Sequence, residues 1–365
     1  MSARRGEIDG KQHAVKPTPG LPPKRDRLSR EGSCYSTSNQ QQATSNNMKT
    51  LFILLTALIP ATMTATKFPE AEISNKTIKA KLYLPDVKEG YYQGTRFDWA
   101  GNIPSLKVNG HEYFGQWFEK YSPEIHDAIM GPVEEFTALD YNEAKPGESF
   151  IKIGVGVLTK PDDKAYSFAR VYPVVDHGKW TIKKKADQVE FTHKLASGEY
   201  SYVYTKTVRL VPGKPEMELV HSLKNTGKKT IETPAYNHNF FVIDNQKVGP
   251  DYTVKFAWDL KGEGNGFGAL AEVEGNKIIF LRNFAKGETV FCPGFEGFGP
   301  SASDYDIRIE NRKAGAGVHI TCDRPLLKQV FWSCWTTPCP EPYILVKAAP
   351  GEEFTWTIRY EFYNL

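Results

Sequence analysis

Arg96 is the first residue in the sequence whose type and setting suggest chemistry. It lies in Thr95-Arg96-Phe97, within the turn-rich segment 94–101. Its planar guanidinium presents several donors in a fixed fork, which suits carboxylates and ligand hydroxyls. A surface ion pair with Asp98 or another acid is the alternative interpretation.

His238 and Glu341 supply groups for acid–base chemistry. His238 is flanked by Asn and Phe residues in segment 236–241. An imidazole titrates near neutral pH and can protonate a neutral oxygen; a core histidine held by a neighbouring Asn is the alternative. Glu341 stands between Pro340 and Pro342, whose rings restrict the backbone and could fix a carboxylate in place. An exposed turn residue is the alternative for Glu341.

Strands must position these groups, because apolar and polar residues alternate from Phe150 to the end of the chain. The clearest run, 354–362, places aromatic and apolar residues on one face and polar residues on the other, as in a half-buried strand. Runs 200–210 and 151–157 follow the same pattern. Short turn sequences such as Val211-Pro-Gly213 separate the runs.

Helix signals are scarce. Only segment 123–139 could form a helical turn or two, and Gly131-Pro132 interrupts it. We therefore predict an all-β fold for residues 66–365: a single domain built as a large antiparallel β-sandwich with few short helices.

The three motifs, taken in order, resemble those of the aldose 1-epimerase (galactose mutarotase) superfamily. Thr95-Arg96-Phe97 is similar to the family's early Asn-Arg-Ile strand, and segment 237–241 to its Asn-His-aromatic motif. Glu341-Pro342, followed by Pro350-Gly351 and a last strand, looks like its C-terminal Glu motif. The resemblance covers roughly residues 75–365. It implies a galactose mutarotase-like supersandwich that binds a mono- or oligosaccharide and needs no cofactor and no metal.

The resemblance also implies roles for individual residues. Glu341 would be the base and His238 the acid, with Arg96 and Asn237 orienting the sugar. Mutarotation needs both: the base acts on the anomeric hydroxyl, the acid on the ring oxygen, and the ring opens and closes on the other face. Each well-placed proton transfer gives about 10²–10⁴-fold. We expect His238 and Glu341 on opposite sides of a pocket for one sugar.

One family motif is missing. The His-Gly-Gly segment, whose His contacts the sugar in the family, corresponds to residues 130–136, where no His occurs. His126 lies four residues before this segment. Glu134 or Glu135 could replace the lost contacts, so His126 and Glu135 join the candidate sugar-binding residues.

Two other functions fit the same sequence. A non-catalytic carbohydrate-binding protein would stack sugars on exposed aromatic rings such as Trp99, Trp117 and Trp335. A glycan lyase or hydrolase would use acids such as Glu134, Glu135 and Glu341, and a hydrolase needs two carboxyl groups about 5–10 Å apart in an open groove.

The N-terminal region has the pattern of an export signal. Residues 1–47 are rich in polar residues, Pro and Arg and are predicted to be a disordered or untranslated leader. Met48-Lys49, a nine-residue apolar stretch (51–59) and small residues up to Ala65 predict a signal peptide over residues 48–65. The apolar stretch is shorter than the about 20 residues that span a bilayer. We therefore expect an exported protein, periplasmic or secreted.

The basic charge of the chain belongs to this leader. The chain has 46 basic and 43 acidic residues, of which nine basic and four acidic residues lie in residues 1–65. Residues 66–365 therefore hold 37 basic and 39 acidic residues, a net charge of −2. This balance gives no sign of nucleic-acid or membrane binding. Four cysteines near the C-terminus (Cys292, Cys322, Cys334, Cys339) could form up to two disulfides after export, and their spacing matches no recognised zinc motif.

Overall fold

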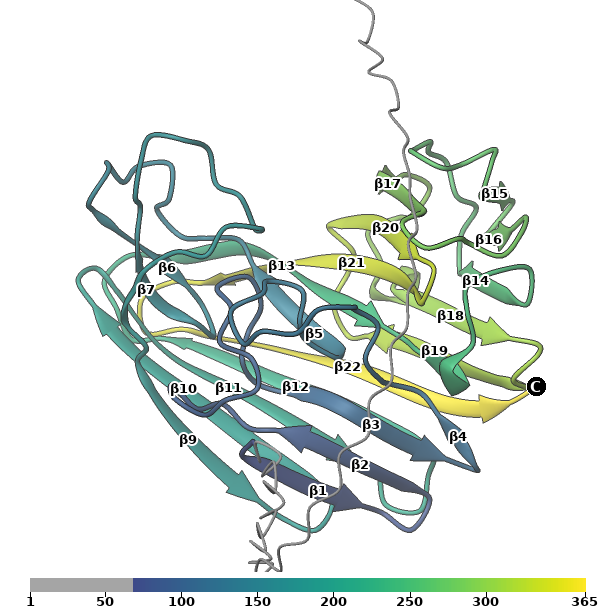
Figure 1. Ribbon diagram of the computed structural model, residues 1–365. Helices are drawn as coiled ribbons and strands as arrows, with labels where there is room; N and C mark the ends of the chain where they lie inside the picture. The colour runs from purple at the N-terminus through teal and green to yellow at the C-terminus, as the bar shows by residue number, and fades with distance from the viewer. Residues whose placement is uncertain (1–67) are drawn as a thin grey trace, which may run out of the picture. The chain divides into compact units, whose positions relative to one another are not determined.

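The computed structural model describes residues 68–365, whose regular secondary structure is almost entirely β-strand (Figure 1). These residues belong to one compact unit, Thr64–Leu365. The predicted leader (1–47) and signal peptide (48–65) lie outside the described residues. Within residues 68–365, no helix is long and apolar enough to cross a membrane.

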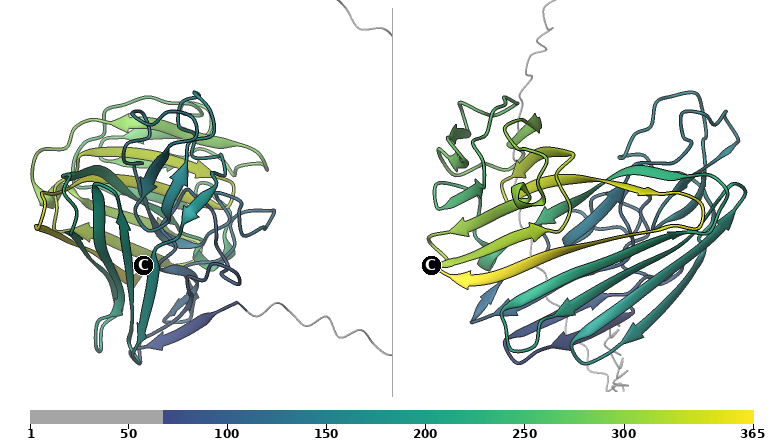
Figure 2. Two further views of the ribbon diagram at one scale, coloured as in Figure 1. Left: turned by 90° about the vertical axis from the view of Figure 1, so that its left-hand side faces the viewer. Right: turned by 180° about the vertical axis from the view of Figure 1, so that it is seen from behind.

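The largest sheet has ten antiparallel strands and forms one layer of the sandwich (Figure 2). In spatial order the strands are β15 (Ala271–Glu274), β16 (Lys277–Phe280), β14 (Tyr252–Phe256), β18 (Asp306–Asn311), β19 (Ala316–Cys322), β22 (Glu353–Asn364), β12 (Glu216–Asn225), β11 (Tyr200–Leu210), β10 (Gln188–Ser197) and β9 (Lys179–Lys184).

Three smaller sheets and two short 3₁₀ helices complete the described part of the chain. The five-stranded sheet runs β17 (Thr289–Phe295), β20 (Lys328–Cys334), β21 (Thr337–Ala348), β13 (Ile231–Phe240) and β5 (Gly131–Phe136). The four-stranded sheet runs β1 (Glu70–Ser74), β2 (Ile78–Tyr83), β3 (Asn102–Val108) and β4 (His111–Glu112). The three-stranded sheet runs β6 (Ser149–Lys152), β7 (Gly156–Thr159) and β8 (Val174–Asp176), and the 3₁₀ helices are η1 (Ile243–Asn245) and η2 (Ala302–Asp304).

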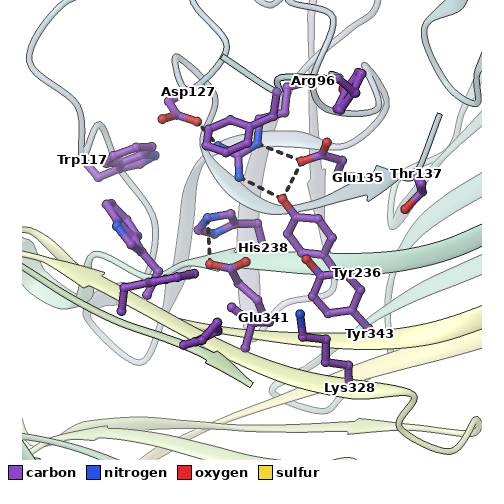
Figure 3. Close-up of a pocket in the computed structure, with 16 residues that line it drawn as sticks. Arg96, Trp117, Asp127, Glu135, Thr137, Tyr236, His238, Lys328, Glu341 and Tyr343 are labelled. Atoms are coloured by element: carbon purple, nitrogen blue, oxygen red, sulfur yellow. Dashed lines mark hydrogen bonds and ion pairs between the residues drawn. The ribbon is translucent and has the colours of Figure 1, made fainter. Parts of the chain in front are cut away.

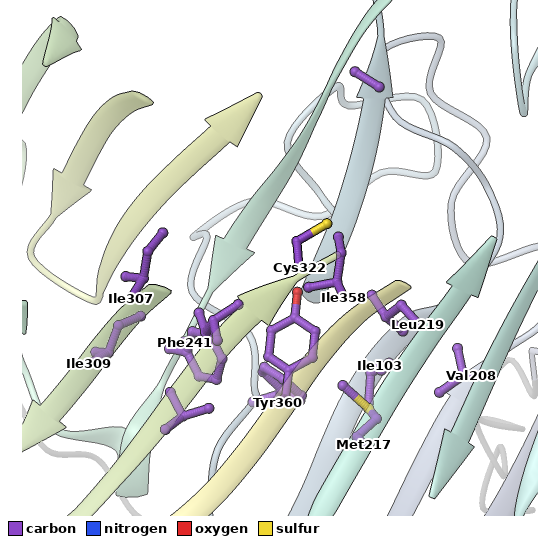
Figure 4. Close-up of a cluster of buried hydrophobic side chains, with 14 of the residues drawn as sticks. Ile103, Val208, Met217, Leu219, Phe241, Ile307, Ile309, Cys322, Ile358 and Tyr360 are labelled. Atoms are coloured by element: carbon purple, nitrogen blue, oxygen red, sulfur yellow. The ribbon is translucent and has the colours of Figure 1, made fainter. Parts of the chain in front are cut away.

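The main core lies between one face of the ten-stranded sheet and the two sheets that cover this face, the four-stranded and the five-stranded sheet. Ile103 of β3 is buried together with Val208, Met217 and Leu219 of the large sheet (Figure 4). From the five-stranded sheet, Asn239 accepts a hydrogen bond from the Tyr360 hydroxyl of β22 at 3.0 Å. The predicted antiparallel β-sandwich is therefore confirmed.

The strands with the clearest alternation form as predicted. In β22 the even-numbered residues from Trp356 to Phe362 are buried, and in β11 all even-numbered residues from Tyr200 to Leu210 are buried. Val211-Pro-Gly213 turns the chain between β11 and β12, with Gly213 at φ 71°, a conformation that glycine adopts without strain.

Two local predictions are wrong. Run 151–157 is not one strand but the hairpin β6–β7, because Gly154 and Gly156 take φ angles of 77° and 144° and reverse the chain. Segment 123–139 forms no helix: it is irregular up to Met130 and then becomes strand β5, which pairs with β13.

The described cysteines form no disulfide. All four are buried free thiols, and burial raises the pKa of Cys322 to about 12. Cys334 pairs with Thr337 and Cys339 with Trp332 across the β20–β21 hairpin, so the register does not place these two cysteines opposite each other.

Candidate active site

A pocket of about 590 Å³ opens over the five-stranded sheet (Figure 3). Its floor is one face of that sheet, built from every second residue of each strand: Glu135 on β5, Tyr236 and His238 on β13, Glu341 and Tyr343 on β21, Lys328, Val330 and Trp332 on β20, and Phe291 and Pro293 on β17. Thr137 and loop residues form the walls: Arg96, Trp117, Asp127, Tyr166 and Phe168. The three segments that the sequence singled out therefore meet here.

The alternation of the strands decides which candidates reach the pocket. Glu135 and His238 face it, whereas their neighbours Glu134 and Asn237 face the core. The Asn237 amide donates to Glu134 at 2.8 Å and accepts from the Tyr360 hydroxyl at 2.9 Å. Asn237, predicted to orient the sugar, is thus on the opposite face of β13 and does not line the pocket.

His238 and Glu341 form a close pair on the pocket floor. Nε2 of His238 lies 3.4 Å from Oε1 of Glu341. Strands β13 and β21 are antiparallel and pair Tyr236 with Tyr343. Two positions later on β13 and two positions earlier on β21, the same register brings His238 and Glu341 next to each other. The imidazole stacks on Phe240 with ring centroids 3.9 Å apart. The two groups are therefore side by side, not on opposite sides of the pocket as expected.

Burial sets the protonation of this pair. It raises the pKa of Glu341 to about 8, and the negative charges of Glu135 and Asp127 add to this effect against that of Arg96. Burial, assisted by the positive charge of Arg96, lowers the pKa of His238 well below its usual range. At neutral pH Glu341 is therefore mainly the protonated acid and His238 the neutral base. The resemblance implied the opposite protonation, with Glu341 as the base and His238 as the acid.

Arg96 is held in the pocket by three polar partners and two aromatic rings. Its Nε donates to Glu135 at 2.9 Å, its Nη2 to the Tyr236 hydroxyl at 2.9 Å, and its Nη1 to Asp127. The guanidinium carbon lies 4.4 Å from the ring centroid of Phe97 and 4.2 Å from that of Phe168. The alternative was a surface ion pair with Asp98 or another acid. Arg96 does pair with two other acids, Glu135 and Asp127, but it is buried in the pocket and not at the surface. Asp98 instead accepts a hydrogen bond from Tyr204 in the core.

Glu135 is a carboxylate with three hydrogen-bond donors around it. It accepts hydrogen bonds from Arg96, from the Tyr236 hydroxyl at 2.5 Å and from Nζ of buried Lys152 at 3.0 Å. Burial raises the pKa of Glu135, but the charges of Lys152 and Arg96 outweigh this effect and hold it below the ordinary value. Glu135 therefore stays ionised at neutral pH, with both of its oxygens hydrogen-bonded.

His126 lies behind the pocket wall and not on it. Its Nε2 lies 2.9 Å from Oδ2 of Asp127, and its ring is tilted against Phe168. Its contacts with the pocket therefore run through two wall residues, Phe168 and Asp127, the second of which also binds Arg96.

Several pocket residues were not predicted from the sequence. Tyr236 is two residues from His238 on one strand, and Trp332 and Lys328 lie on one face of β20, so the alternation could have identified all three. Asp127, Tyr166 and Phe168 come from irregular loops, and no local pattern marks their positions.

The comparisons with known proteins concern the fold. No protein-family model and no curated protein matches the sequence. Among solved structures, an Escherichia coli K12 protein provisionally assigned as an aldose 1-epimerase aligns with 14% identity over 81% of this chain and 99% of its own, at a TM-score of 0.51. The Slr1438 protein of Synechocystis sp. PCC 6803 aligns with 9% identity over 82% and 97%, also at 0.51.

A galactose mutarotase-like protein of Lactobacillus casei ATCC 334 aligns with 14% identity over 80% of this chain and all of its own, at a TM-score of 0.49. At these identities the similarity is one of fold. The chain therefore adopts the galactose mutarotase-like β-sandwich fold.

Proposed function

We propose that the pocket binds a saccharide and interconverts its anomers, with His238 and Glu341 as the acid–base pair. The observation that carries this proposal is the pairing of a protonated carboxyl and a neutral imidazole, 3.4 Å apart, on the floor of an aromatic-lined pocket. The aldose 1-epimerase assignment of a structure with the same fold supports it.

The adjacency of the pair suits the reaction. The anomeric hydroxyl and the ring oxygen are bonded to the same carbon, so the groups that act on them must also be close together. Glu341 gives its proton to the ring oxygen while Nε2 of His238 takes the proton of the anomeric hydroxyl. The bond between the anomeric carbon and the ring oxygen breaks, and an open-chain aldehyde forms.

Ring closure runs the same transfers backward. After rotation of the aldehyde, the former ring hydroxyl attacks its other face and returns a proton to the Glu341 carboxylate. The new anomeric oxygen takes the proton from His238. The pair ends as it began, with one proton on Glu341, and no other reactant is consumed.

Arg96 supports the pair without exchanging protons. Burial lowers the pKa of His238, and the positive charge of Arg96 adds to this effect, so the imidazole stays in its base form. The bonds of Arg96 to Glu135, Asp127 and Tyr236 fix the wall beside the reacting groups.

The same contacts speak against glycan hydrolysis. Two free carboxyl groups are needed on either side of the scissile bond, yet Glu135 is occupied by three donors and Asp127 by Arg96 and His126. Among the acids that line this pocket, Glu341 is the one without an arginine or lysine ion pair within residues 68–365.

The proposed activity is tested with fresh single anomers of a panel of aldoses, followed by polarimetry or proton NMR. We expect faster equilibration than in enzyme-free buffer for at least one sugar. Uniform inactivity together with measurable saccharide binding would overturn the enzyme proposal in favour of a carbohydrate-binding protein.

Export is a separate proposal, which rests on the pattern of residues 48–65. Expression of the full chain in a secreting host should yield a protein that begins near Thr66 by N-terminal sequencing. Retention inside the cell with residues 48–65 intact would contradict it.

A further inference from the structure

A second cavity, of about 660 Å³, borders the pocket and shares one wall residue with it, Trp117. Its remaining lining comes from four places: residues 116–119 on either side of Trp117, residues 245–247 after β13, Lys286, and the turn residues Trp335 and Thr336 of the β20–β21 hairpin. The acid–base mechanism uses none of them.

Trp117 is a rigid partition between the two cavities. Its indole stacks on Phe240 at 4.4 Å and 9°, and its Nε1 donates to the Ile129 carbonyl at 2.8 Å. Trp332, from the pocket floor, meets it edge-on at 5.5 Å. On the other side, the Thr336 hydroxyl donates to the Trp117 carbonyl at 2.8 Å, which ties the hairpin turn of the second cavity to the same residue.

The lining of the second cavity combines flat apolar surface with hydrogen-bonding groups. Trp335 is half-buried, and the Lys247 ammonium lies 4.9 Å from its ring centroid. Glu119 and Lys286 pair at 2.9 Å. Asn245 is exposed, its backbone has a φ of 55°, and within residues 68–365 its side-chain amide has no hydrogen-bond partner. Aromatic faces beside amides and charged groups suit a ligand with both C–H faces and hydroxyls.

We propose that this cavity is a second sugar subsite, so that the substrate is a reducing oligosaccharide of two or more rings. The inference rests on the proposed function for the placement of the first ring. The reducing ring must lie in the first pocket, because its anomeric carbon has to reach His238 and Glu341. The next ring is attached through another carbon, passes the edge of Trp117, and lies on Trp335 in the second cavity.

The test compares glucose with maltose and cellobiose, and galactose with β-1,4-galactobiose. Anomer exchange is measured by NMR and binding by calorimetry. For the disaccharide that fits, we expect kcat/KM at least about tenfold above that of its monosaccharide, equivalent to about 1.4 kcal/mol. Trp335→Ala should bring this ratio close to one, whereas Trp335→Phe, which keeps an aromatic face, should retain most of it.

Glu119→Gln gives a second variant in case Trp335→Ala does not fold, and it should also lower the disaccharide preference. Equal kcat/KM and equal affinity for each monosaccharide and its disaccharides would overturn the subsite. The two proposals can fail separately. Tighter disaccharide binding that Trp335→Ala abolishes, without any anomer exchange, would keep the subsite and reject the proposed reaction.

Discussion

The imidazole Nε2 of His238 and the carboxyl Oε1 of Glu341 lie 3.4 Å apart on neighbouring strands of the pocket floor. Both side chains are almost completely buried. Because burial disfavours both charged forms, the carboxyl keeps its proton and the imidazole stays neutral. The pair therefore offers one acid and one base at a single point, and this proton placement has consequences that can be measured.

The first prediction concerns the pH dependence of kcat/KM. The reactive form has Glu341 protonated, with a pKa of about 8, and His238 neutral, with a pKa well below 6.5. Activity should be level through neutral pH and fall about tenfold per unit above pH 8, after subtraction of the enzyme-free rate. An increase in kcat/KM through pH 8 would instead show that ionised Glu341 is the reactive form.

The second prediction concerns stability. The pKa of Glu341 is raised in the folded state, so the folded protein binds a proton that the unfolded chain releases between about pH 4.5 and 8. The stabilisation that this bound proton gives to the folded state falls across this window by about 1.4 kcal/mol per pH unit. Glu341→Gln removes the effect, so the variant should gain stability relative to wild type by a few kcal/mol between pH 5 and pH 8 in urea denaturation. A constant difference between the two proteins at both pH values would contradict this.

The third prediction concerns the core beneath the pocket. Lys206 is completely buried, pairs with Glu134 and donates to the Ala100 carbonyl at 3.0 Å. Lys206→Met leaves the buried carboxylate without its cation and should cost about 3–5 kcal/mol of unfolding free energy. The control is Lys183→Met, which breaks an exposed pair with Glu190 and should cost at most about 1 kcal/mol. Similar losses in the two variants would show that the buried pair is not important for stability.

The fourth prediction concerns Arg96. Its guanidinium donates from three separate nitrogens to Glu135, Asp127 and Tyr236, whereas a lysine presents all its donors from one nitrogen and cannot reach the three acceptors from the same places. Arg96→Lys should lower kcat/KM by about tenfold or more, whereas Arg282→Lys, at an exposed pair with Glu288, should leave it within about twofold. Activity of Arg96→Lys equal to that of the control would remove Arg96 from the site.

Much of the fold follows from patterns that the sequence displays locally. The alternation in 354–362 identifies the buried face of β22, and Pro-Gly turns mark strand ends. The same alternation, applied strictly, would have placed Asn237 and His238 on opposite faces, because neighbouring residues of a strand point in opposite directions. It would also have placed Glu134 and Glu135 on opposite faces of their strand.

The adjacency of His238 and Glu341 could not be obtained in this way. It depends on the register between β13 and β21, whose paired residues are more than one hundred positions apart. Register is set by packing of the whole sheet, not by the residues of either strand alone. For the same reason Lys152 was missed: it reaches Glu135 from the hairpin β6–β7, which the glycines at 154 and 156 create within an apparently continuous strand.

The most direct test of the central claim is the anomer exchange rate of Glu341→Gln, measured by NMR on a sugar that the wild type accepts. Glutamine preserves the size of the side chain and removes its transferable proton. Glu232→Gln, the same change on strand β13 at an exposed pair with Lys347, is the control. We predict that kcat falls by about 10²–10⁴-fold in Glu341→Gln and stays within about twofold in the control. A Glu341→Gln rate within a few-fold of wild type would contradict the assignment of Glu341 as the acid.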